Sequence, residues 1–516
     1  MSRSIQFRRS TAILTLVAAS IGGGLIAAFA VATHSNAPVY VTAKAATNPT
    51  TKASEISNSF ADVIEKASPA VVNISSVRVI KASEQQGQGQ GGNPFMNDPF
   101  FRQFFGGPGA RPRDQRESGL GSGIITSPQG YILTNNHVVD KATSLKVTLL
   151  DGRQFPAKLV GADPQTDVAV VKIEANNLPT LPFASSSNAR VGDLCFAIGN
   201  PFGYDHTVTM GIVSAKGRSL EGGGHLQDFI QTDAAINPGN SGGALINAKG
   251  ELIGMNTAII SGGSAFGGEA GNIGIGFAVP SDMAKRVMDQ LIKSGKVSRG
   301  YIGVLLQHVT PDLAQQFGLK DIHAAVISDV TPGAPGAKAG LKAGDAITAI
   351  DGHPIKDSND LQMQVTEHAP GSTVSLDVVR DGKPMKINVP LGTRPTAANF
   401  GEEGRNQQGN ENGGEEGNDN AAKSSYGITV QSLTPDLSQQ LGVPSTVHGV
   451  VVDNVDPGSA AADTLTRGDV ITAVERHPVA NVGDFQRWIR QANGKSVLLT
   501  INRGGQNAFV VLQPTK

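Results

Sequence analysis

The residue best placed to act as a nucleophile is Ser241, in the run Asn237-Pro-Gly-Asn-Ser-Gly-Gly243. A serine hydroxyl attacks a carbonyl group only where the backbone exposes it and directs N–H groups at the developing oxyanion. The flanking glycines allow the turn conformations that this requires. Gly239 and Ser241 carry the natural donors, and Asn240 between them completes the expected oxyanion hole. Because a turn of this kind is common, a base and an orienting carboxylate must also be found.

His137, one of ten histidines, is expected to be the base. It follows a predicted strand at residues 131–134, and a strand end is where a β-barrel can present a side chain to a cleft. The orienting carboxylate is expected to be Asp167, because a turn enters an apolar strand there and would half-bury the side chain. Asp163 precedes a proline and is better explained as a turn residue. Asp140 lies too close to His137 along the chain to orient the ring from behind.

The segment that carries these residues is predicted to be rich in β-structure. Between residues 119 and 280, short apolar, β-prone runs alternate with clusters of turn-forming residues. This density of strand and turn indicates an antiparallel barrel or sandwich. Residues 281–294 then show apolar residues at helical spacing, which predicts a closing helix with Ser281 as its N-cap.

One module of roughly ninety residues occurs twice after this segment. Thr310-Pro-Asp-Leu-Ala-Gln-Gln-Phe-Gly-Leu319 recurs as Thr434-Pro-Asp-Leu-Ser-Gln-Gln-Leu-Gly-Val443. Gly344-Asp-Ala-Ile-Thr-Ala-Ile350 recurs as Gly468-Asp-Val-Ile-Thr-Ala-Val474. Residues 396–424 between the copies are rich in Asn, Gly and Glu, so we expect a disordered acidic linker that lets the second copy move.

Composition excludes several classes of partner and site. The 516 residues include 43 Lys and Arg against 44 Asp and Glu, and a net charge of -1 gives no reason to expect nucleic acid as a partner. Cys195 is the single cysteine, which excludes an intrachain disulfide framework and a cysteine-based zinc or iron–sulfur site. We expect no metal and no cofactor.

The N-terminal residues have the order of an export signal. Three arginines within the first nine residues precede an uncharged stretch at residues 11–32. This stretch is longer than the usual apolar core of a signal peptide, about 7–15 residues, and close to the ~20 residues that span a bilayer. Residues 1–35 are therefore expected to be either a cleaved signal peptide or a retained membrane anchor, followed by a flexible tether at residues 36–57.

A low-complexity segment follows the first predicted strand. Residues 85–92 are a Gln/Gly run, and the next twenty or so residues contain a group of phenylalanines: Phe95, Phe100, Phe101, Phe104 and Phe105. Either this loop docks on another part of the protein or on another copy of it, or it is a disordered insertion with a sticky patch.

Together these motifs resemble the HtrA/Deg family of periplasmic serine endoproteases. The residues that carry the resemblance are Thr134-Asn-Asn-His-Val-Val139, Asp163-Pro-Gln-Thr-Asp-Val-Ala169 and Gly239-Asn-Ser-Gly-Gly243. The resemblance implies a mostly β chain, in which a chymotrypsin-like double β-barrel is followed by two small α+β PDZ domains. It also implies that His137 is the general base and acid, Asp167 orients it, and Ser241 forms an acyl-enzyme.

On this resemblance the chain divides into three folded domains. The protease domain is expected at residues 58–295, with a regulatory loop at 84–113. The first PDZ domain is expected at residues 299–395 and the second at 425–516. Ala235 and Ile236 would help to form the floor of the primary pocket, where no carboxylate receives Lys or Arg, so a small aliphatic residue is expected before the cut bond. Asp233, the one nearby charge, is expected to be structural.

In a PDZ domain, N–H groups of an X-apolar-Gly-apolar turn receive a C-terminal carboxylate while the peptide adds as a strand. The matching residues are Ile302, Gly303 and Val304 in the first copy, and Tyr426, Gly427 and Ile428 in the second. Because Tyr426 replaces Ile302, the two pockets are expected to differ. For each copy the alternative is a scaffold that binds no peptide.

The resemblance implies an ATP-independent endopeptidase that degrades unfolded or misfolded proteins in the cell envelope. The alternative is a holdase chaperone or stress sensor in which proteolysis is secondary. A homotrimer or a multiple of it is expected in the bacterial periplasm, soluble after signal cleavage or anchored in the inner membrane. The Phe-rich loop resembles a family loop that reaches into a neighbouring active site in resting oligomers.

Overall fold

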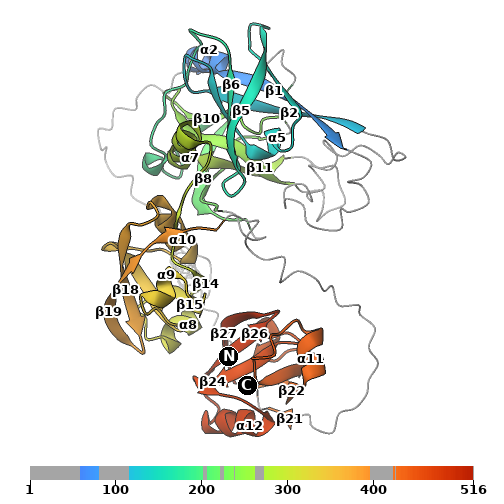
Figure 1. The fold of residues 1–516 in the computed structure, drawn as a ribbon, viewed down its shortest axis with the longest axis vertical. Coiled ribbons are helices and arrows are strands. Elements are labelled where there is room, and N and C mark those ends of the chain that lie inside the picture. Colours follow the sequence, from blue (N-terminus) through green and yellow to red (C-terminus); the bar gives the residue numbers. More distant parts are fainter. Residues whose placement is uncertain are drawn as a thin grey trace, which may run out of the picture. The chain divides into compact units, whose positions relative to one another are not determined.

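The computed structural model describes residues 59–80, 115–201, 206–220, 226–237, 239–261, 272–395, 422–424 and 426–514. The predicted signal or anchor, the tether, the Phe-rich loop and nearly all of the acidic linker lie outside these residues. Figure 1 shows a β-rich body and two smaller modules that follow it in the chain. In the part of the chain that the structure describes, no helix is long and apolar enough to cross a membrane.

The first half of the β-rich body is a closed antiparallel barrel with the strand order β1-β2-β3-β6-β5-β4. Its strands are β1 (Val71–Ile80), β2 (Gln115–Ile125), β3 (Tyr131–Thr134), β4 (Ser144–Thr148), β5 (Gln154–Asp163) and β6 (Val168–Ile173). The interior is filled by aliphatic side chains such as Ile74, Ile132 and Val171, which are fully buried. Their β-branched shape packs well on a pleated surface.

The second half is another closed antiparallel barrel, with the strand order β10-β11-β12-β9-β8-β7. Its strands are β7 (Leu194–Gly199), β8 (Thr207–Arg218), β9 (Phe229–Thr232), β10 (Ala244–Asn247), β11 (Leu252–Ser261) and β12 (Asn272–Pro280). The barrel form of the sequence prediction is therefore confirmed.

A shared apolar layer joins the two barrels. It is built from both barrels and from α2 (Ala61–Ala67) and α7 (Ser281–Ser294). Phe60 packs on Phe196 of β7 with ring centroids 4.9 Å apart. Short helical segments complete the body: η1 (Ser68–Ala70), α5 (Asn136–Val139) and η2 (Ser186–Asn188).

The closing helix α7 forms as predicted, but Ser281 does not cap it. Pro280 occupies the N-cap position, and the Ser281 hydroxyl donates to the carbonyl oxygen of Ala184 at 2.6 Å. This acceptor comes from a segment 97 residues earlier. The local sequence contains no information about such a distant partner, so the capping prediction was wrong.

The first module contains one sheet in the order β14-β15-β16-β18-β19, with β17 paired to β16, and a small sheet of β13 and β20. Its elements are β13 (Gly300–Tyr301), β14 (Val304–His308), α8 (Pro311–Gln316), β15 (Ala325–Val330), α9 (Pro335–Lys338), β16 (Ala346–Ile350), β17 (His353–Pro354), α10 (Ser358–Glu367), β18 (Thr373–Arg380), β19 (Lys383–Pro390) and β20 (Gly392–Thr393).

The second module repeats this arrangement, with the sheet order β21-β22-β23-β24-β26-β27. Its elements are β21 (Ala422–Lys423), β22 (Ile428–Ser432), α11 (Pro435–Gln440), β23 (Val450–Val455), η5 (Ala460–Asp463), β24 (Val470–Val474), β25 (His477–Pro478), α12 (Val482–Gln491), β26 (Val497–Arg503) and β27 (Gln506–Leu512). The repeat seen in the sequence is therefore a structural repeat.

The repeated sequence runs have the same local roles in both modules. Thr310 and Thr434 cap α8 and α11, and each side chain accepts a hydrogen bond from the backbone N–H three residues later. These caps explain why the Thr-Pro-Asp-Leu run begins a helix twice, because proline fits the first helical position and the threonine satisfies a free N–H group.

Candidate active site

Two antiparallel strands bring His137 and Asp167 together. Strand β3 pairs with β6, with Thr134 opposite Ala169. The end of β3 and the start of β6 therefore lie at the same edge of the first barrel. His137 follows β3 in α5, and Asp167 directly precedes β6 with φ at 55°. An aspartate in this left-handed conformation reverses the chain at the edge and turns its side chain toward the helix.

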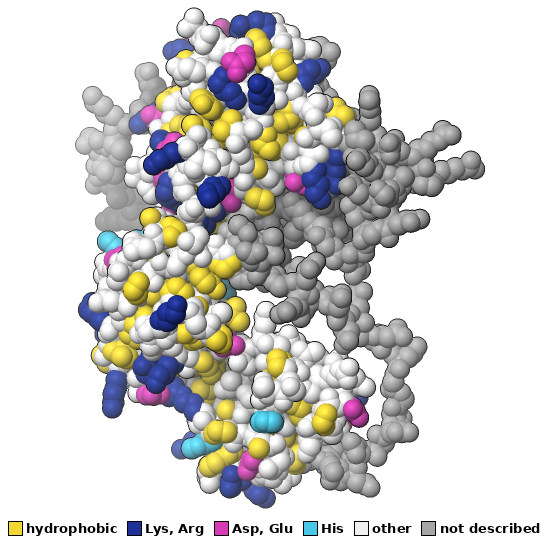
Figure 2. Space-filling model, in the orientation of Figure 1, with side chains coloured by type: hydrophobic (Ala, Val, Ile, Leu, Met, Phe, Trp, Pro, Cys, Tyr) yellow, Lys and Arg dark blue, Asp and Glu magenta, His cyan; other side chains and the backbone are white. Residues whose placement is uncertain are grey.

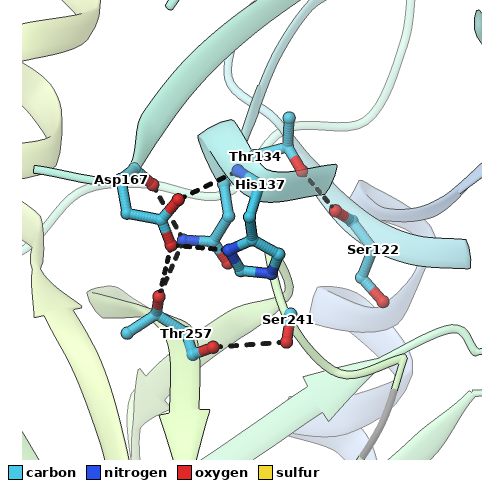
Figure 3. A network of polar contacts seen from close by, with 7 residues as sticks. Ser122, Thr134, His137, Asp167, Ser241 and Thr257 are labelled. Carbon is cyan, nitrogen blue, oxygen red and sulfur yellow. Dashed lines mark hydrogen bonds and ion pairs between the residues drawn. The ribbon is translucent and has the colours of Figure 1, made fainter. Parts of the chain in front are cut away.

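The Asp167 carboxylate holds His137 at two atoms. Oδ2 lies 2.7 Å from Nδ1 of the ring, and Oδ1 accepts from the His137 backbone N–H at 3.0 Å. Both side chains are only 4% exposed. A carboxylate at Nδ1 favours the tautomer with its proton on that nitrogen, so the lone pair is on Nε2. Figure 3 shows that Nε2 is on the side of the ring that faces Ser241.

Two further residues, which the sequence interpretation missed, fix Asp167. The Thr257 hydroxyl on β11 donates to Oδ2 at 2.8 Å. The Asn135 amide donates to the Asp167 carbonyl oxygen at 3.0 Å and to the Thr257 hydroxyl at 3.1 Å. Asn135 lies two residues before His137 in the Thr134–Val139 motif, so the local sequence could have indicated it. Thr257 has no local signal, because only the closure of the two barrels brings it near.

Ser241 lies in the turn before β10, and contacts with both barrels hold it. Its carbonyl oxygen accepts from the Ser122 N–H of β2 at 2.8 Å. Its hydroxyl donates to the Thr257 carbonyl oxygen at 3.3 Å. Gly242, with φ at 83°, approaches β2 so closely that a Cβ atom there would be 2.2 Å from the Ser122 carbonyl oxygen. This residue must therefore be glycine for steric reasons.

The turn around Gly239 offers two of the three expected oxyanion donors. Within the described residues, the N–H groups of Gly239 and Ser241 have no hydrogen-bond acceptor. The Asn240 N–H instead donates to the Asn237 carbonyl oxygen at 3.0 Å. The Gly239 carbonyl accepts from the Ser122 hydroxyl at 2.6 Å, so this peptide unit is fixed at both ends. The turn itself therefore uses the Asn240 N–H, and the N–H groups of Gly239 and Ser241 are the two that can serve an oxyanion.

The residues expected at the primary pocket lie beside the second barrel. The Ala235 carbonyl accepts from the Thr209 hydroxyl at 2.7 Å. Ile236 is 2% exposed and packs among the apolar side chains inside the barrel. The Asp233 carboxylate accepts from the Ile212 N–H at 2.7 Å, which gives this charge the structural role that was expected.

The two X-apolar-Gly-apolar turns have the same backbone form. Gly303 and Gly427 have φ at 81° and 78°. Ile302 lines a cavity of about 660 Å³ together with Val304 and α10. Tyr426 is fully buried, and its hydroxyl donates to the Lys495 carbonyl oxygen at 2.6 Å. Ile428 is also buried. Where the first turn has Ile302, the second therefore has a larger side chain, Tyr426, which a hydrogen bond holds in place.

Within the described ranges, no cluster of three or more His, Cys, Asp or Glu side chains could hold a metal ion. Cys195 lies buried in β7, and its sulfur contacts the Thr232 hydroxyl at 3.2 Å. Burial raises the pKa of this thiol to about 11, so it remains protonated at neutral pH.

Comparison with protein families supports this organisation. A trypsin-like peptidase domain matches residues 121–255, and a PDZ domain matches residues 300–391 and again 451–503. We call the two modules the first and second PDZ domains from here on.

Known proteins resemble the chain over most of its length. A probable periplasmic serine endoprotease DegP-like of Chlamydia pneumoniae is 42% identical over 467 residues, which are 89% of this chain and 90% of that protein. A protein of the same description from Pseudomonas fulva (strain 12-X) is 40% identical over 466 residues, 88% of this chain and 93% of that protein.

Solved structures agree with these sequence matches. The HtrA-type protease AlgW with decapeptide is 43% identical and has a TM-score of 0.52, covering 66% of this chain and 99% of that one. The same protease with tripeptide is 41% identical, with a TM-score of 0.53 and the same coverage. With both barrels, the PDZ repeats and these relatives in agreement, the chain belongs to the HtrA-type, DegP-like family and is a serine endopeptidase.

Proposed function

We propose that Ser241, His137 and Asp167 are the catalytic triad of this endopeptidase. The observation that carries the proposal is the 2.7 Å contact between His137 Nδ1 and Asp167 Oδ2, on the side of the ring away from Ser241. This arrangement leaves a basic nitrogen facing a hydroxyl, as general-base activation of a serine requires.

The proposed reaction starts with a rotation of the Ser241 hydroxyl from the Thr257 carbonyl toward His137 Nε2. Oγ then attacks the carbonyl carbon of the substrate while its proton moves to Nε2. Asp167 stabilises the resulting imidazolium, and the N–H groups of Gly239 and Ser241 bind the oxyanion. The imidazolium gives its proton to the leaving amine. Water, activated by the same ring, hydrolyses the acyl-enzyme and restores the hydroxyl.

The test of the triad compares three proteins with an active-site fluorophosphonate probe and an unfolded protein substrate. Ser241→Ala should lose both labelling and cleavage. Asp167→Asn should retain the fold but lose about 10⁴-fold in kcat, because the ring is then held in the wrong tautomer. Labelling of Ser241→Ala at full rate would show that another residue is the nucleophile.

We further propose that the substrates are unfolded or misfolded proteins of the periplasm and that the PDZ domains bind C-terminal peptides. The relatives are named as periplasmic serine endoproteases, which supports the periplasm as the location of this protein. The AlgW structures with bound peptides support peptide binding. We propose that residues 1–35 direct the chain to the periplasm, either as a cleaved signal peptide or as a retained membrane anchor. We propose that the protein assembles as a homotrimer or a multiple of it.

The same Ser241→Ala variant separates this function from that of a holdase. If proteolysis is the main activity, the variant should leave an aggregating client protein undegraded and give little protection against aggregation. Equal suppression of aggregation by the parent and the variant, measured by light scattering, would favour the holdase.

Deletion of residues 85–112 tests the Phe-rich loop. If this loop inhibits the resting enzyme, its removal should raise the basal activity.

A further inference from the structure

The cavity of the first PDZ domain is lined by a cationic residue, Arg394, which has no role when backbone N–H groups alone receive the peptide carboxylate. The cavity, about 660 Å³ in volume, lies between the Tyr301–Val304 turn and α10, and Arg394 forms part of its wall. Residues 217–220 and Gln227 of the protease domain complete the lining. The turn and Arg394 therefore line one space.

The turn presents unused hydrogen-bond donors at this cavity. Within the described residues, the N–H groups of Ile302 and Gly303 have no hydrogen-bond acceptor. Their carbonyl groups do have partners: Ile302 accepts from Gly336 N–H at 2.7 Å, and Gly303 accepts from Thr331 N–H at 3.0 Å. The turn is therefore fixed through its carbonyl groups, and its N–H groups remain available for a ligand.

The position of Arg394 is set by the small sheet of β13 and β20. Gly300 pairs with Thr393, and the Arg394 N–H donates to the Arg299 carbonyl oxygen at 2.9 Å. Arg394 thus stands directly beside the start of the binding turn. Its two terminal nitrogens each lie 3.1 Å from the Gln362 amide oxygen of α10, in the amide orientation that satisfies both groups.

Arg394 lacks the anionic partner that a partly buried guanidinium requires. Its Nε is buried and has no hydrogen-bond partner. No carboxylate of the described residues forms an ion pair with it, and the nearby Asp163 is already held in a bidentate contact by Arg299. Burial lowers the pKa of Arg394, and the charge of Arg299 lowers it further. Both effects oppose a charge that a bound anion would stabilise.

We propose that Arg394 binds the carboxylate of a peptide ligand in the groove of the first PDZ domain, beside the free N–H groups of Ile302 and Gly303. This inference rests on the proposed peptide-binding function of that domain. A guanidinium can form a two-point, charge-assisted contact with a carboxylate, which backbone donors alone do not supply. The groove would then select for ligand charge as well as for an extended backbone.

The carboxylate has two possible sources, the C-terminus of the peptide or an Asp or Glu side chain. The test therefore uses fluorescein-labelled decapeptides that end in valine, leucine or phenylalanine, each made as the free acid and as the C-terminal amide. A third set carries glutamate in the last position and a C-terminal amide. Binding is measured by fluorescence anisotropy on the full chain with Ser241→Ala, which prevents cleavage.

Replacement of Arg394 should then weaken only the peptides that bring a carboxylate. We expect Arg394→Gln to reduce the affinity for the peptides that supply the carboxylate roughly tenfold or more, the loss expected for a charge-assisted hydrogen bond, and to leave the amides that end in valine, leucine or phenylalanine unchanged. Arg394→Lys should retain more affinity than Arg394→Gln, because the positive charge remains although an ammonium group cannot make the two-point contact of a guanidinium. Lys383→Gln removes an exposed charge from the same domain and should change nothing.

The outcomes separate this inference from the function on which it rests. Equal weakening of acids and amides, or none, would overturn the role of Arg394 while peptide binding stands. A loss confined to the free acids assigns the terminal carboxylate, and a loss for the glutamate amides assigns a side chain; either supports the inference. If the parent binds no peptide in any form, the peptide-binding function fails and the inference fails with it.

Discussion

At the scale of single residues, Thr257 contacts both ends of the proposed catalytic array. Its hydroxyl donates to Asp167 Oδ2 at 2.8 Å, and its carbonyl oxygen accepts from the Ser241 hydroxyl at 3.3 Å. One residue of β11 thus orients the carboxylate and holds the nucleophile before substrate binds. We infer that Thr257 is a positioning residue, which acts through Asp167 and does not touch the substrate.

Thr257→Val keeps the shape of the side chain and removes both hydrogen bonds of its hydroxyl, the one donated to Asp167 and the one accepted from the Asn135 amide. We expect kcat to fall about 5–30-fold, the effect of losing ~1–2 kcal/mol of hydrogen bonding to Asp167, with KM nearly unchanged. Thr257→Ser should restore most of the activity, because the hydroxyl returns. Thr143→Val, whose exposed hydroxyl bonds to the Val77 carbonyl, is the matched control. A change in KM alone would contradict a role in orienting Asp167.

The residues that could be predicted from the sequence are those with a local signature. His137, Asp167 and Ser241 each follow or precede a strand in a short run of polar and turn-forming residues, so their positions were predictable. Thr257 was not, because its contact with Asp167 joins residues 90 positions apart across two barrels. The use of the Asn240 N–H within its own turn was not predictable either, because the direction of one N–H group in a turn cannot be inferred from residue types.

At the scale of elements, each PDZ domain contains the same ion pair, in which the aspartate is buried and the arginine is partly exposed. Asp345 and Asp469 are each 1% exposed, and they bind Arg380 and Arg503 at the ends of β18 and β26. Each aspartate belongs to the repeated Gly-Asp run of the sequence, which explains why that run recurs. The hydrogen bond to Asp345 raises the pKa of Arg380, and the bond to Asp469 does the same for Arg503.

Asp345→Asn should destabilise the first PDZ domain more than Asp469→Asn destabilises the second. The Arg380 side chain is 24% exposed and the Arg503 side chain 52% exposed, so water replaces the lost partner better in the second domain. We expect losses of about 2–4 and 1–2 kcal/mol. Amide hydrogen exchange measures each domain separately within the full chain. Asp381→Asn, at an exposed pair, should have almost no effect. Equal losses would contradict this account.

A half-buried carboxylate before β9, Asp228, makes stability depend on pH. Burial raises the pKa of Asp228 from 3.8 to about 6, although Lys356 opposes the shift. The folded chain therefore holds this proton more tightly than the unfolded chain, and it loses stability as the pH rises from 4 to above 6. Asp228→Asn should remove that loss and raise stability at pH 8 by up to about 3 kcal/mol, with about a third of that gain at pH 4.5.

Thermal unfolding at the two pH values checks this expectation. Asp289→Asn, in an exposed pair with Lys285, controls for the loss of one negative charge and should be neutral at both. A stabilisation by Asp228→Asn that is the same at pH 4.5 and pH 8 would show that packing, and not ionisation, is responsible.

At the scale of the whole molecule, the architecture could be predicted from the sequence more completely than the individual contacts between residues. The double barrel and the repeated modules follow from strand spacing and from an internal repeat, both of which are written along the chain. The Arg299–Asp163 pair was not predictable, because it joins the segment before the first PDZ domain to the protease domain, 136 positions away. Figure 2 shows basic side chains scattered over the visible face, with acidic side chains beside some of them.

The cleavage preference tests how the barrels present a substrate to the triad. Near the nucleophile, the acid Asp233 is engaged by the Ile212 N–H, and Ala235 and Ile236 offer only apolar side chains. Digestion of a permanently unfolded protein, followed by mass spectrometry, should therefore give fragments that end mainly in valine, alanine or isoleucine. A small apolar pocket selects among aliphatic residues by only about 10- to 200-fold, so the preference should be graded.

Two variants make this measurement decisive. Ser241→Ala should give no fragments, which shows that the cuts come from the proposed nucleophile and not from a contaminant. Asp233→Asn should leave the preference unchanged, because the amide oxygen can still accept from the Ile212 N–H and no substrate charge is involved. Fragments that end in lysine or arginine, and that disappear with Asp233→Asn, would instead make Asp233 the specificity residue. The pocket would then recognise charge, and the structural role given to this carboxylate would be wrong.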